Sequence, residues 1–373
     1  MIKIRQHFKK LDWPLIVIAL LLVVFGLLSI YSSSLGHSPT GEASGRGDFF
    51  NFKKQVIFFG LGLLFMFLLS FLNWRIFRDD PYLILILYVL CLFLLIGLYF
   101  FAPEIRGVKS WFRLGPVSMD PIEITRIVLI ILLAKYFSVR HIEMYRIRHI
   151  LLSGLYIFLP AALIFFQPNL GSVLTLFFLW LGVLIISGIK LRHFLILVLC
   201  GLLFFILSWT TILKNYQKER ILSFVQPQLS DPLKIGWSQR QAKIAIGSGG
   251  ILGQGFGRGS QTQYGFLSEP QTDFIFAAIA EEFGLIGAGV LLFLYSLLIW
   301  RIIKTAFEAT SNFPRLFATG LAISIFSQVF INIGMNLGVL PIIGIPLPLL
   351  SYGGGSLISI LIGLGVLQSI RIH

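Results

Sequence analysis

Few residues of this sequence could take part in chemistry, and the most distinctive is Asp273. It is a lone carboxylate in the motif Thr272-Asp-Phe-Ile-Phe276, between a glycine-rich segment and an apolar run. Carboxylates act as general acids or bases in enzymes, and Asp also caps helices by accepting hydrogen bonds from free N–H groups. The sequence therefore leaves two interpretations of Asp273, a functional carboxylate or a helix cap.

Two further charged groups lie inside apolar runs, where an ionisable side chain costs about 2.5–3.5 kcal/mol if the run crosses a membrane. Glu123 and Arg126 are three residues apart, so they share one helix face and can pair. They form either a structural ion pair or a charge pair that lines a polar cavity. Glu281 and Glu282 are adjacent, so at least one of them faces the protein interior, where a structural role is favoured.

Two segments have features of phosphate binding. Arg106, Lys109 and Arg113 surround Trp111, and such a cluster either attracts a phosphate-bearing lipid or is a solvated loop. Residues 247–259 contain seven glycines. Backbone N–H groups of a glycine-rich loop can cradle a phosphate, although a tight, turn-rich loop is the favoured interpretation. The two cysteines and six histidines are scattered without metal-ligand spacing.

The composition shows what kind of protein positions these residues. Of 373 residues, 57% are hydrophobic and 12% are charged, and the mean hydropathy is +0.89. Soluble domains contain about 25% charged residues, so a soluble globular protein and a disordered chain are both excluded. The net charge of +14 is then a topology signal and a contact with anionic membrane lipids, and not a sign of nucleic-acid binding.

Ten runs are long enough for transmembrane helices, which need about 20 apolar residues. They are 14–33, 55–73, 82–102, 121–138, 150–167, 170–188, 193–212, 273–302, 316–337 and 348–369. With a cytoplasmic N-terminus, 16 of the 30 Lys and Arg residues lie in inside segments and six lie in short outer loops. The positive-inside rule then places both termini in the cytoplasm. The break at Gln167-Pro-Asn169 fits two spans better than one kinked helix.

The long loop of residues 213–272, between spans seven and eight, then faces outward. Residues 214–224 are expected to form an interfacial amphipathic helix, and residues 237–246 a second helix. The last outer loop contains Pro341, Pro346 and Pro348, which prevent a continuous helix. Irregular backbone at membrane depth must be buried in protein or line a cavity, so this loop is expected to pack against an internal site.

Several separated motifs point to one family. They are Asn332-Ile-Gly-Met335, Gly344-Ile-Pro-Leu-Pro348, Ser351-Tyr-Gly-Gly354, Thr272-Asp-Phe-Ile-Phe-Ala277, Glu281-Glu-Phe-Gly284, Gln241–Gly250, Asp12-Trp13 and Gly107–Trp111. Together they resemble the SEDS family (shape, elongation, division and sporulation), most closely its RodA branch, along essentially the whole chain. The resemblance implies an all-α integral membrane protein of one domain, residues 1–373, with about ten transmembrane helices, cytoplasmic termini and one large extracytoplasmic loop.

The resemblance also implies a peptidoglycan glycosyltransferase. Its members polymerise lipid II on the outer face of the bacterial cytoplasmic membrane, here during cell elongation, together with a class B penicillin-binding protein that acts as transpeptidase. Asp273 matches the family's essential aspartate, and Glu123 and Arg126 match the Glu and Lys of its Gln-Pro-Ser-Glu-x-x-Lys pattern. This sequence departs from the family at Asp120-Pro-Ile-Glu123, at Arg126, at Ser110 and at Asn169, where Asp is usual.

The mechanism implied by the resemblance needs a base and a group that neutralises a pyrophosphate. Asp273 is the expected general base, which gives inversion at the anomeric carbon. The expected substrate-binding residues, for the pyrophosphate or for holding Asp273, are Arg106, Lys109, Lys243, Glu123 and Arg126. A divalent metal ion is a candidate cofactor, and no ligands for it are assigned.

Three alternatives stay open at this point. The first is a lipid II flippase or transporter, which would need a polar path across the whole bilayer, whereas the unusual polar residues gather in the outer half. The second is a polymerase of the division branch, although the motif Asn332-Ile-Gly-Met335 favours the elongation branch. The third is a non-catalytic scaffold that recruits a partner protein, although the specificity of the Asp273 motif disfavours it.

Overall fold

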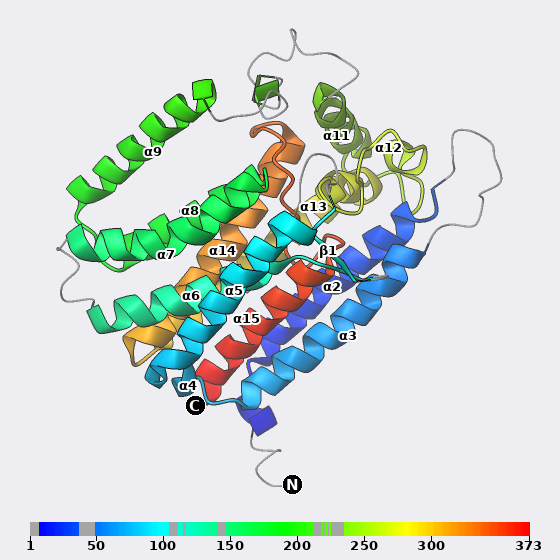
Figure 1. The fold of residues 1–373 in the computed structure, drawn as a ribbon. Helices are drawn as coiled ribbons and strands as arrows, with labels where there is room; N and C mark the ends of the chain where they lie inside the picture. Colours follow the sequence, from blue (N-terminus) through cyan, green and yellow to red (C-terminus); the bar gives the residue numbers. More distant parts are fainter. Residues whose placement is uncertain are drawn as a thin grey trace.

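The computed structural model describes residues 7–36, 49–103, 111–114, 117–140, 147–211, 218–219, 221–222, 224 and 235–373. Its long helices run side by side in one bundle, with α11 and α12 at one end and the C-terminus at the other (Figure 1). The elements are α2 (Trp13–Ser33), α3 (Phe50–Phe71), α4 (Arg75–Asp79), α5 (Pro81–Phe101), β1 (Phe112–Leu114), β2 (Val117–Met119), α6 (Pro121–Arg140), α7 (Ile147–Phe166), α8 (Leu170–Ile186), α9 (Leu191–Thr211), α11 (Ile235–Gly249), α12 (Ser260–Gln263), α13 (Ile275–Glu308), α14 (Asn312–Leu337) and α15 (Gly354–Ile372).

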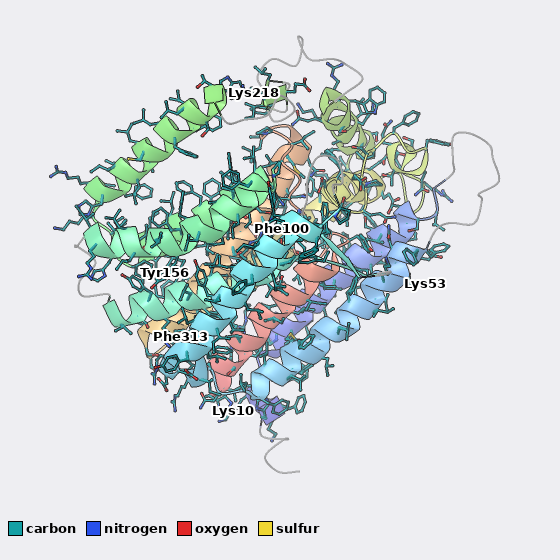
Figure 2. All side chains as sticks on the ribbon, viewed as in Figure 1. Lys10, Lys53, Phe100, Tyr156, Lys218 and Phe313 are labelled. Carbon is teal, nitrogen blue, oxygen red and sulfur yellow. The ribbon has the colours of Figure 1, made fainter. Side chains whose placement is uncertain are left out.

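The all-α membrane architecture predicted from the sequence is confirmed, and each predicted span corresponds to a helix. Among the described residues, eight helices are long and apolar enough to cross a membrane, and α8 is a shorter apolar helix. Lys10 lies near one end of the bundle and Lys53 and Lys218 near the other (Figure 2). Charges at both ends and apolar side chains between them are what a bilayer requires of a bundle.

Two predictions about the chain need correction. The last span was expected to begin at residue 348, but α15 begins at Gly354, because the prolines before it prevent helix. A short antiparallel hairpin was not expected: β1 pairs with β2, with Phe112 opposite Met119, and leads directly into α6. The helix expected at 237–246 is confirmed as α11, and the amphipathic segment at 214–224 lies largely outside the described residues.

The core of the bundle is formed around α14 and α15, whose side chains are mostly buried. Gly365 of α15 lets α3 approach closely, since a Cβ atom added to it would lie 2.7 Å from the Met66 carbonyl oxygen. Small residues at helix crossings allow such contact in membranes. By contrast, α9 stands apart from the other helices (Figure 1), and most of its large apolar side chains are exposed. Lipid, and not protein, is the expected neighbour of that helix.

The break between α7 and α8 confirms two separate helices. α7 ends at Phe166, and α8 begins at Leu170 with Asn169 as its N-cap. The Asn169 side chain accepts from the Ser172 N–H at 3.1 Å. Asn caps helices about as well as Asp, which gives a structural reason why the amide is tolerated at this position.

The glycine-rich loop that follows α11 fills a break inside α13. Gly284 has φ 66° and ψ −163°, a conformation that essentially only glycine adopts. The Glu281 and Glu282 carbonyls accept from the N–H groups of Gln254 and Gly255, and the Leu285 N–H donates to the Gly250 carbonyl. The loop therefore supplies the hydrogen bonds that the interrupted helix lacks.

This pairing contradicts the phosphate-cradle interpretation of the glycine-rich loop. Its N–H groups point at protein acceptors, which include the Ser32 hydroxyl, bonded by the Gly257 N–H at 3.1 Å. In α12, which follows the loop, the N–H groups of Gln261 and Thr262 donate to the Glu281 carboxylate at 2.6 Å and 3.1 Å. Glu282 accepts from the hydroxyl of Ser32 on α2. Both carboxylates are buried. The structural role expected for them is thus what the structure shows, since they attach the loop to α2 and α13.

Candidate active site

Asp273 lies in a turn directly before α13, and its peptide carbonyl is held by two side-chain amides. The Nδ2 atoms of Asn332 and Asn336 each donate to the Asp273 carbonyl oxygen at 3.0 Å. Both asparagines are on α14, one turn apart, and both are fully buried. A carbonyl oxygen has two lone pairs, so the two amides saturate it. They thereby fix the peptide plane from which the Asp273 side chain projects.

The first turn of α13 begins directly after the turn that carries Asp273, and a side chain of α14 bonds to it. Phe274 is the N-cap residue of α13, and it makes no side-chain cap hydrogen bond. The first-turn N–H of Ala277 is satisfied by Asn336, whose Oδ1 accepts it at 3.2 Å. The amide of α14 thus satisfies one N–H of the first helical turn, and the choice between a cap and a functional carboxylate for Asp273 remains a prediction.

The carboxylate of Asp273 faces the loop of residues 338–353, here called the α14–α15 loop. A Cβ atom added to Gly344 would lie 3.5 Å from Asp273 Oδ2, and Gly344 has a positive φ of 69°. Asp273 itself is half-buried. A side chain at position 344 would contact the carboxylate, and the positive φ of Gly344 favours glycine there.

The turn before Asp273 is attached to the same loop through its backbone. The Gln271 carbonyl accepts from the Tyr352 N–H at 2.7 Å, and the Thr272 carbonyl accepts from the Ser351 hydroxyl at 2.6 Å. Three consecutive carbonyls, those of residues 271 to 273, are therefore bonded to the α14–α15 loop or to α14. The expectation that this proline-rich loop packs against an internal site is confirmed.

Lys243 reaches the same end of the bundle from α11. Its side chain lies over Gly338, the left-handed residue that ends α14 two positions after Asn336. A cation is favoured there because the carbonyl end of a helix carries partial negative charge. Lys243 is exposed, so its ammonium group is accessible to an anionic ligand.

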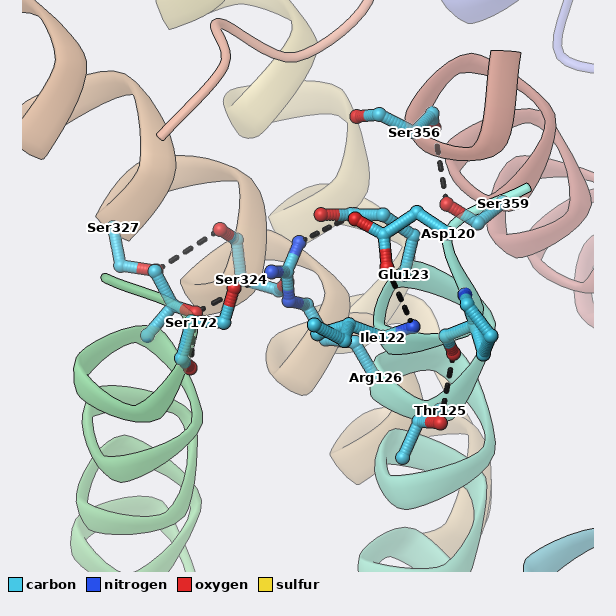
Figure 3. Close-up of polar contacts among 12 residues, drawn as sticks. Asp120, Ile122, Glu123, Thr125, Arg126, Ser172, Ser324, Ser327, Ser356 and Ser359 are labelled. Atoms are coloured by element: carbon cyan, nitrogen blue, oxygen red, sulfur yellow. Dashed lines mark hydrogen bonds and ion pairs between the residues drawn. The ribbon is translucent and has the colours of Figure 1, made fainter. Parts of the chain in front are cut away.

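Glu123 and Arg126 form a buried ion pair within the bundle (Figure 3). Arg126 Nη1 lies 2.6 Å from Glu123 Oε2, and the two side chains are only 4% and 7% exposed. Arg126 Nη2 also donates to the Thr175 hydroxyl of α8 at 3.3 Å. Gln328 of α14 lies against the same guanidinium and accepts from Nη2 at 3.3 Å when its amide oxygen faces the arginine.

The ion pair therefore joins α6, α8 and α14. It is engaged with protein groups on several sides, which is the arrangement of a structural ion pair. The substrate-binding role expected for Glu123 and Arg126 remains a prediction. Among the other expected basic residues, Arg106 and Lys109 lie outside the described residues, as does the side chain of Arg113.

A metal ion finds little support in the arrangement of side chains. Within the part of the chain that the structure describes, no group of three His, Cys, Asp or Glu side chains could hold an ion. Asp273 is a single carboxylate in the turn before α13, and Asn169 is used as a helix cap. The divalent metal ion therefore remains a prediction, and the chemistry below is derived from the protein's own residues.

Sequence reasoning gave no separate role to the amides of α14. Gln328, Asn332 and Asn336 recur every four residues within an apolar helix, which places them on one face. A run of amides with this spacing in a transmembrane segment was the available signal, because each buried amide needs partners. The sequence could not show that two of them meet at Asp273.

The fold and the site together define an all-helical, polytopic membrane protein with one carboxylate fixed at one end of its bundle. The family described as "Cell cycle protein", that of FtsW, RodA and SpoVE, matches residues 12–373. The chain therefore belongs to this family, the SEDS family.

Individual relatives agree with this assignment along nearly the whole chain. The peptidoglycan glycosyltransferase MrdB of Escherichia coli K12 is 36% identical over 364 residues, which cover 97% of this chain and 94% of MrdB. The stage V sporulation protein E of Bacillus subtilis is 35% identical, covering 96% of both chains.

Solved structures agree as well. A chain from a peptidoglycan synthase complex that coordinates polymerization and crosslinking matches with a TM-score of 0.78 and 32% identity, covering 97% of both chains. The rod shape determining protein RodA of Thermus thermophilus matches with a TM-score of 0.70 and 31% identity, covering 97% of this chain and 96% of RodA.

Proposed function

We propose that this protein is a peptidoglycan glycosyltransferase that polymerises lipid II, with Asp273 as its general base. One observation carries the proposal: in a chain that aligns end to end with a peptidoglycan glycosyltransferase, the Asp273 carbonyl is bound by two buried amides. These bonds fix the backbone from which the Asp273 carboxylate projects, and general-base catalysis requires a well-placed carboxylate. The likeness to RodA and MrdB favours the elongation branch over the division branch.

The bond-forming step uses few protein groups. The acceptor hydroxyl gives its proton to Asp273 while its oxygen bonds to the anomeric carbon of the donor sugar. The bond from that carbon to the pyrophosphate oxygen breaks, and the lipid pyrophosphate leaves with the electron pair. Attack from the side opposite the leaving group inverts the anomeric carbon. Because two lipid-anchored substrates meet in one plane, much of the rate comes from orientation.

The leaving pyrophosphate needs positive charge. Lys243 is the described residue best placed to supply it, because it is exposed and its side chain lies over the end of α14, two residues beyond Asn336. Arg106 and Lys109 are proposed to add to it from the loop before β1. A fixed cation that meets charge as it develops stabilises the transition state.

Glu123 and Arg126 are proposed to act at a distance. Their burial and mutual pairing suit residues that hold α6 against α8 and α14. In this view they keep the helices that carry the site in register.

The setting of the reaction follows from the same proposal. The end of the bundle with α11 and Asp273 faces outward from the bacterial cytoplasmic membrane, and both termini are cytoplasmic. A class B penicillin-binding protein is the proposed partner, in keeping with the similar chain of a peptidoglycan synthase complex. Membrane lipids surround the protein, and the cytoplasmic membrane is its proposed location.

The test is polymerisation of purified lipid II by the full-length protein in detergent, with and without a class B penicillin-binding protein. Wild type is expected to give glycan strands, and Asp273→Asn is expected to lose about 100-fold or more of the rate, as for removal of a general base. Asn caps helices as well as Asp does, so a cap role predicts an active variant. Equal activity of both proteins would remove Asp273 as the base, and an inactive wild type with its partner present would contradict the proposed function.

A further inference from the structure

The polar face of α14 runs toward Asp273 and ends on it. Gln328, Asn332 and Asn336 are spaced by four residues and are all at most 1% exposed. They extend over about 12 Å of helix, at 1.5 Å per residue. Buried amides in an apolar helix are costly unless they are bonded, so the bonds that they make indicate what they are for.

From this arrangement we propose that Asn332 and Asn336 are positioning residues for Asp273. The inference rests on the proposed function, and it assigns the two asparagines to the same reaction without contact to substrate. Each donates to the Asp273 carbonyl at 3.0 Å. Asn336 also donates to the main-chain carbonyl of Asn332 at 2.8 Å and to its side-chain Oδ1 at 3.3 Å, so the two residues are bonded to one another as well.

The same two amides also bond the two segments that lie next to Asp273, the α14–α15 loop and the first turn of α13. Asn332 donates to the Ile345 carbonyl at 2.7 Å, and Ile345 follows Gly344, the residue that faces Asp273 Oδ2. Asn336 accepts from the Ala277 N–H at 3.2 Å. One helix face thus sets the position of the turn, of the first turn of α13 and of the α14–α15 loop relative to one another.

The same face of α14 connects the buried ion pair of Glu123 and Arg126 to the turn that carries Asp273. Gln328 lies against Arg126, one turn below Asn332 on the same face. A shift of α14 relative to α6 would therefore move the amides that hold Asp273. The reach of a catalytic group is sensitive to such shifts, because a displacement of about 1 Å can cost about 100-fold in rate.

The experiment compares Asn332→Ala with Gln368→Ala in the full-length protein. Gln368 is a matched control, because it is also a buried amide bonded to backbone: it accepts from the Asp12 N–H at 2.9 Å and donates to the Asp12 carbonyl at 3.3 Å. It lies near the C-terminus, at the end of the bundle opposite Asp273. Asn336→Ser provides a second variant, which removes the other amide that bonds the Asp273 carbonyl and adds no bulk.

Two quantities are measured for each variant. One is kcat for lipid II polymerisation, and the other is the affinity and stoichiometry of binding for lipid II whose acceptor hydroxyl is blocked. We expect Asn332→Ala and Asn336→Ser to bind this probe stoichiometrically with an unchanged Kd, and to lose about 30- to 100-fold in kcat. A protein that is merely less well folded would lose stoichiometry together with rate.

Several results would overturn the inference. If Asn332→Ala and Asn336→Ser keep kcat within about threefold of Gln368→Ala, which is far less than a displaced base would cost, the amides do not position Asp273. If both lose probe binding along with rate, they only maintain the fold. Asp273→Asn in the same assay separates the two proposals. If Asp273→Asn is inactive while Asn332→Ala is fully active, only the positioning role of the two asparagines is refuted. An inactive wild-type protein refutes the proposed glycosyltransferase function, and the positioning role of the two asparagines falls with it.

Discussion

The buried pair of Glu123 and Arg126 gives the sharpest test of how the bundle is held together. We consider three variants, Arg126→Met, Glu123→Met and the double variant. Methionine is unbranched and apolar and replaces much of the volume of either side chain. The single variants leave one member of the pair buried without the other, whereas the double variant removes both.

The expected magnitudes follow from the contacts of each side chain. With Arg126 removed, the Glu123 carboxylate is only 7% exposed and has lost its cation, which typically costs about 3–5 kcal/mol of unfolding free energy. The double variant has neither charge of the pair. Thr175 keeps a partner because its hydroxyl also donates to the Ser172 carbonyl at 2.8 Å. The loss that remains is the contact of Gln328, which is worth about 1–3 kcal/mol.

We therefore expect the double variant to be more stable than either single variant by about 2 kcal/mol. The assay is reversible unfolding in mixed micelles at rising SDS content. Arg78→Met is the control, because Arg78 and Asp79 also form an ion pair at 2.6 Å but are exposed. Exposed pairs contribute little to stability, so this variant should unfold almost like wild type.

A double variant as unstable as Arg126→Met would refute the reasoning, because it would show that the charge itself is not what makes the single variants unstable. Polymerisation measured on the same preparations adds a second distinction. Recovery of both stability and rate in the double variant would make the pair purely structural. Recovery of stability alone would mean that the pair matters to the reaction itself, through substrate binding or through the contact of Arg126 with α14.

Three further predictions follow from single positions. Gly284→Ala should destabilise the protein by about 1–3 kcal/mol or more, because its Cβ would lie 2.4 Å from the Gly253 nitrogen. The control is Gly289→Ala in the same helix, whose Cβ meets nothing within 4 Å and which should gain up to about 1 kcal/mol of stability. Equal unfolding free energies for the two variants would contradict the helix break. Gly344→Ala should lower the polymerisation rate by about tenfold at near-normal substrate affinity, because a φ of 69° is strained for alanine and a shift of the loop facing the Asp273 carboxylate would move a catalytic group. An unchanged rate would show that this loop does not help to position the carboxylate. Lys243→Gln should raise KM for lipid II about five- to tenfold, an effect that weakens at high salt as screening predicts, and a KM that is unchanged at low salt would exclude Lys243 from the pyrophosphate.

Much of the architecture could be predicted from the sequence because a bilayer imposes few solutions. Apolar runs of about 20 residues must be helices there, since unpaired backbone groups cannot be buried in lipid. The prolines at 341, 346 and 348 likewise indicated an irregular loop inside the protein. Helix ends were less predictable, and α15 begins six residues after the expected start because the apolar run continues through non-helical backbone.

The candidate site was only partly visible in the sequence. Asp273 was identified by its motif, and Glu123 and Arg126 by their spacing. The sequence could not decide between a cap and a functional carboxylate for Asp273, because both need the same residue at the same kind of boundary. The structure adds that Asn336, 63 residues away, bonds both the Asp273 carbonyl and the Ala277 N–H, and the role of the carboxylate itself remains a prediction.

The sequence by itself determined the class of the protein, the spans and the family, because hydropathy and motifs are local properties of the chain. Only the tertiary structure decided that the glycine-rich loop completes the broken helix α13, and that the amides of α14 meet the Asp273 carbonyl. The physical reason is that a hydrogen bond depends on distance and direction between groups that may be far apart in the chain. No local pattern records those contacts, so they emerge only when the helices are packed.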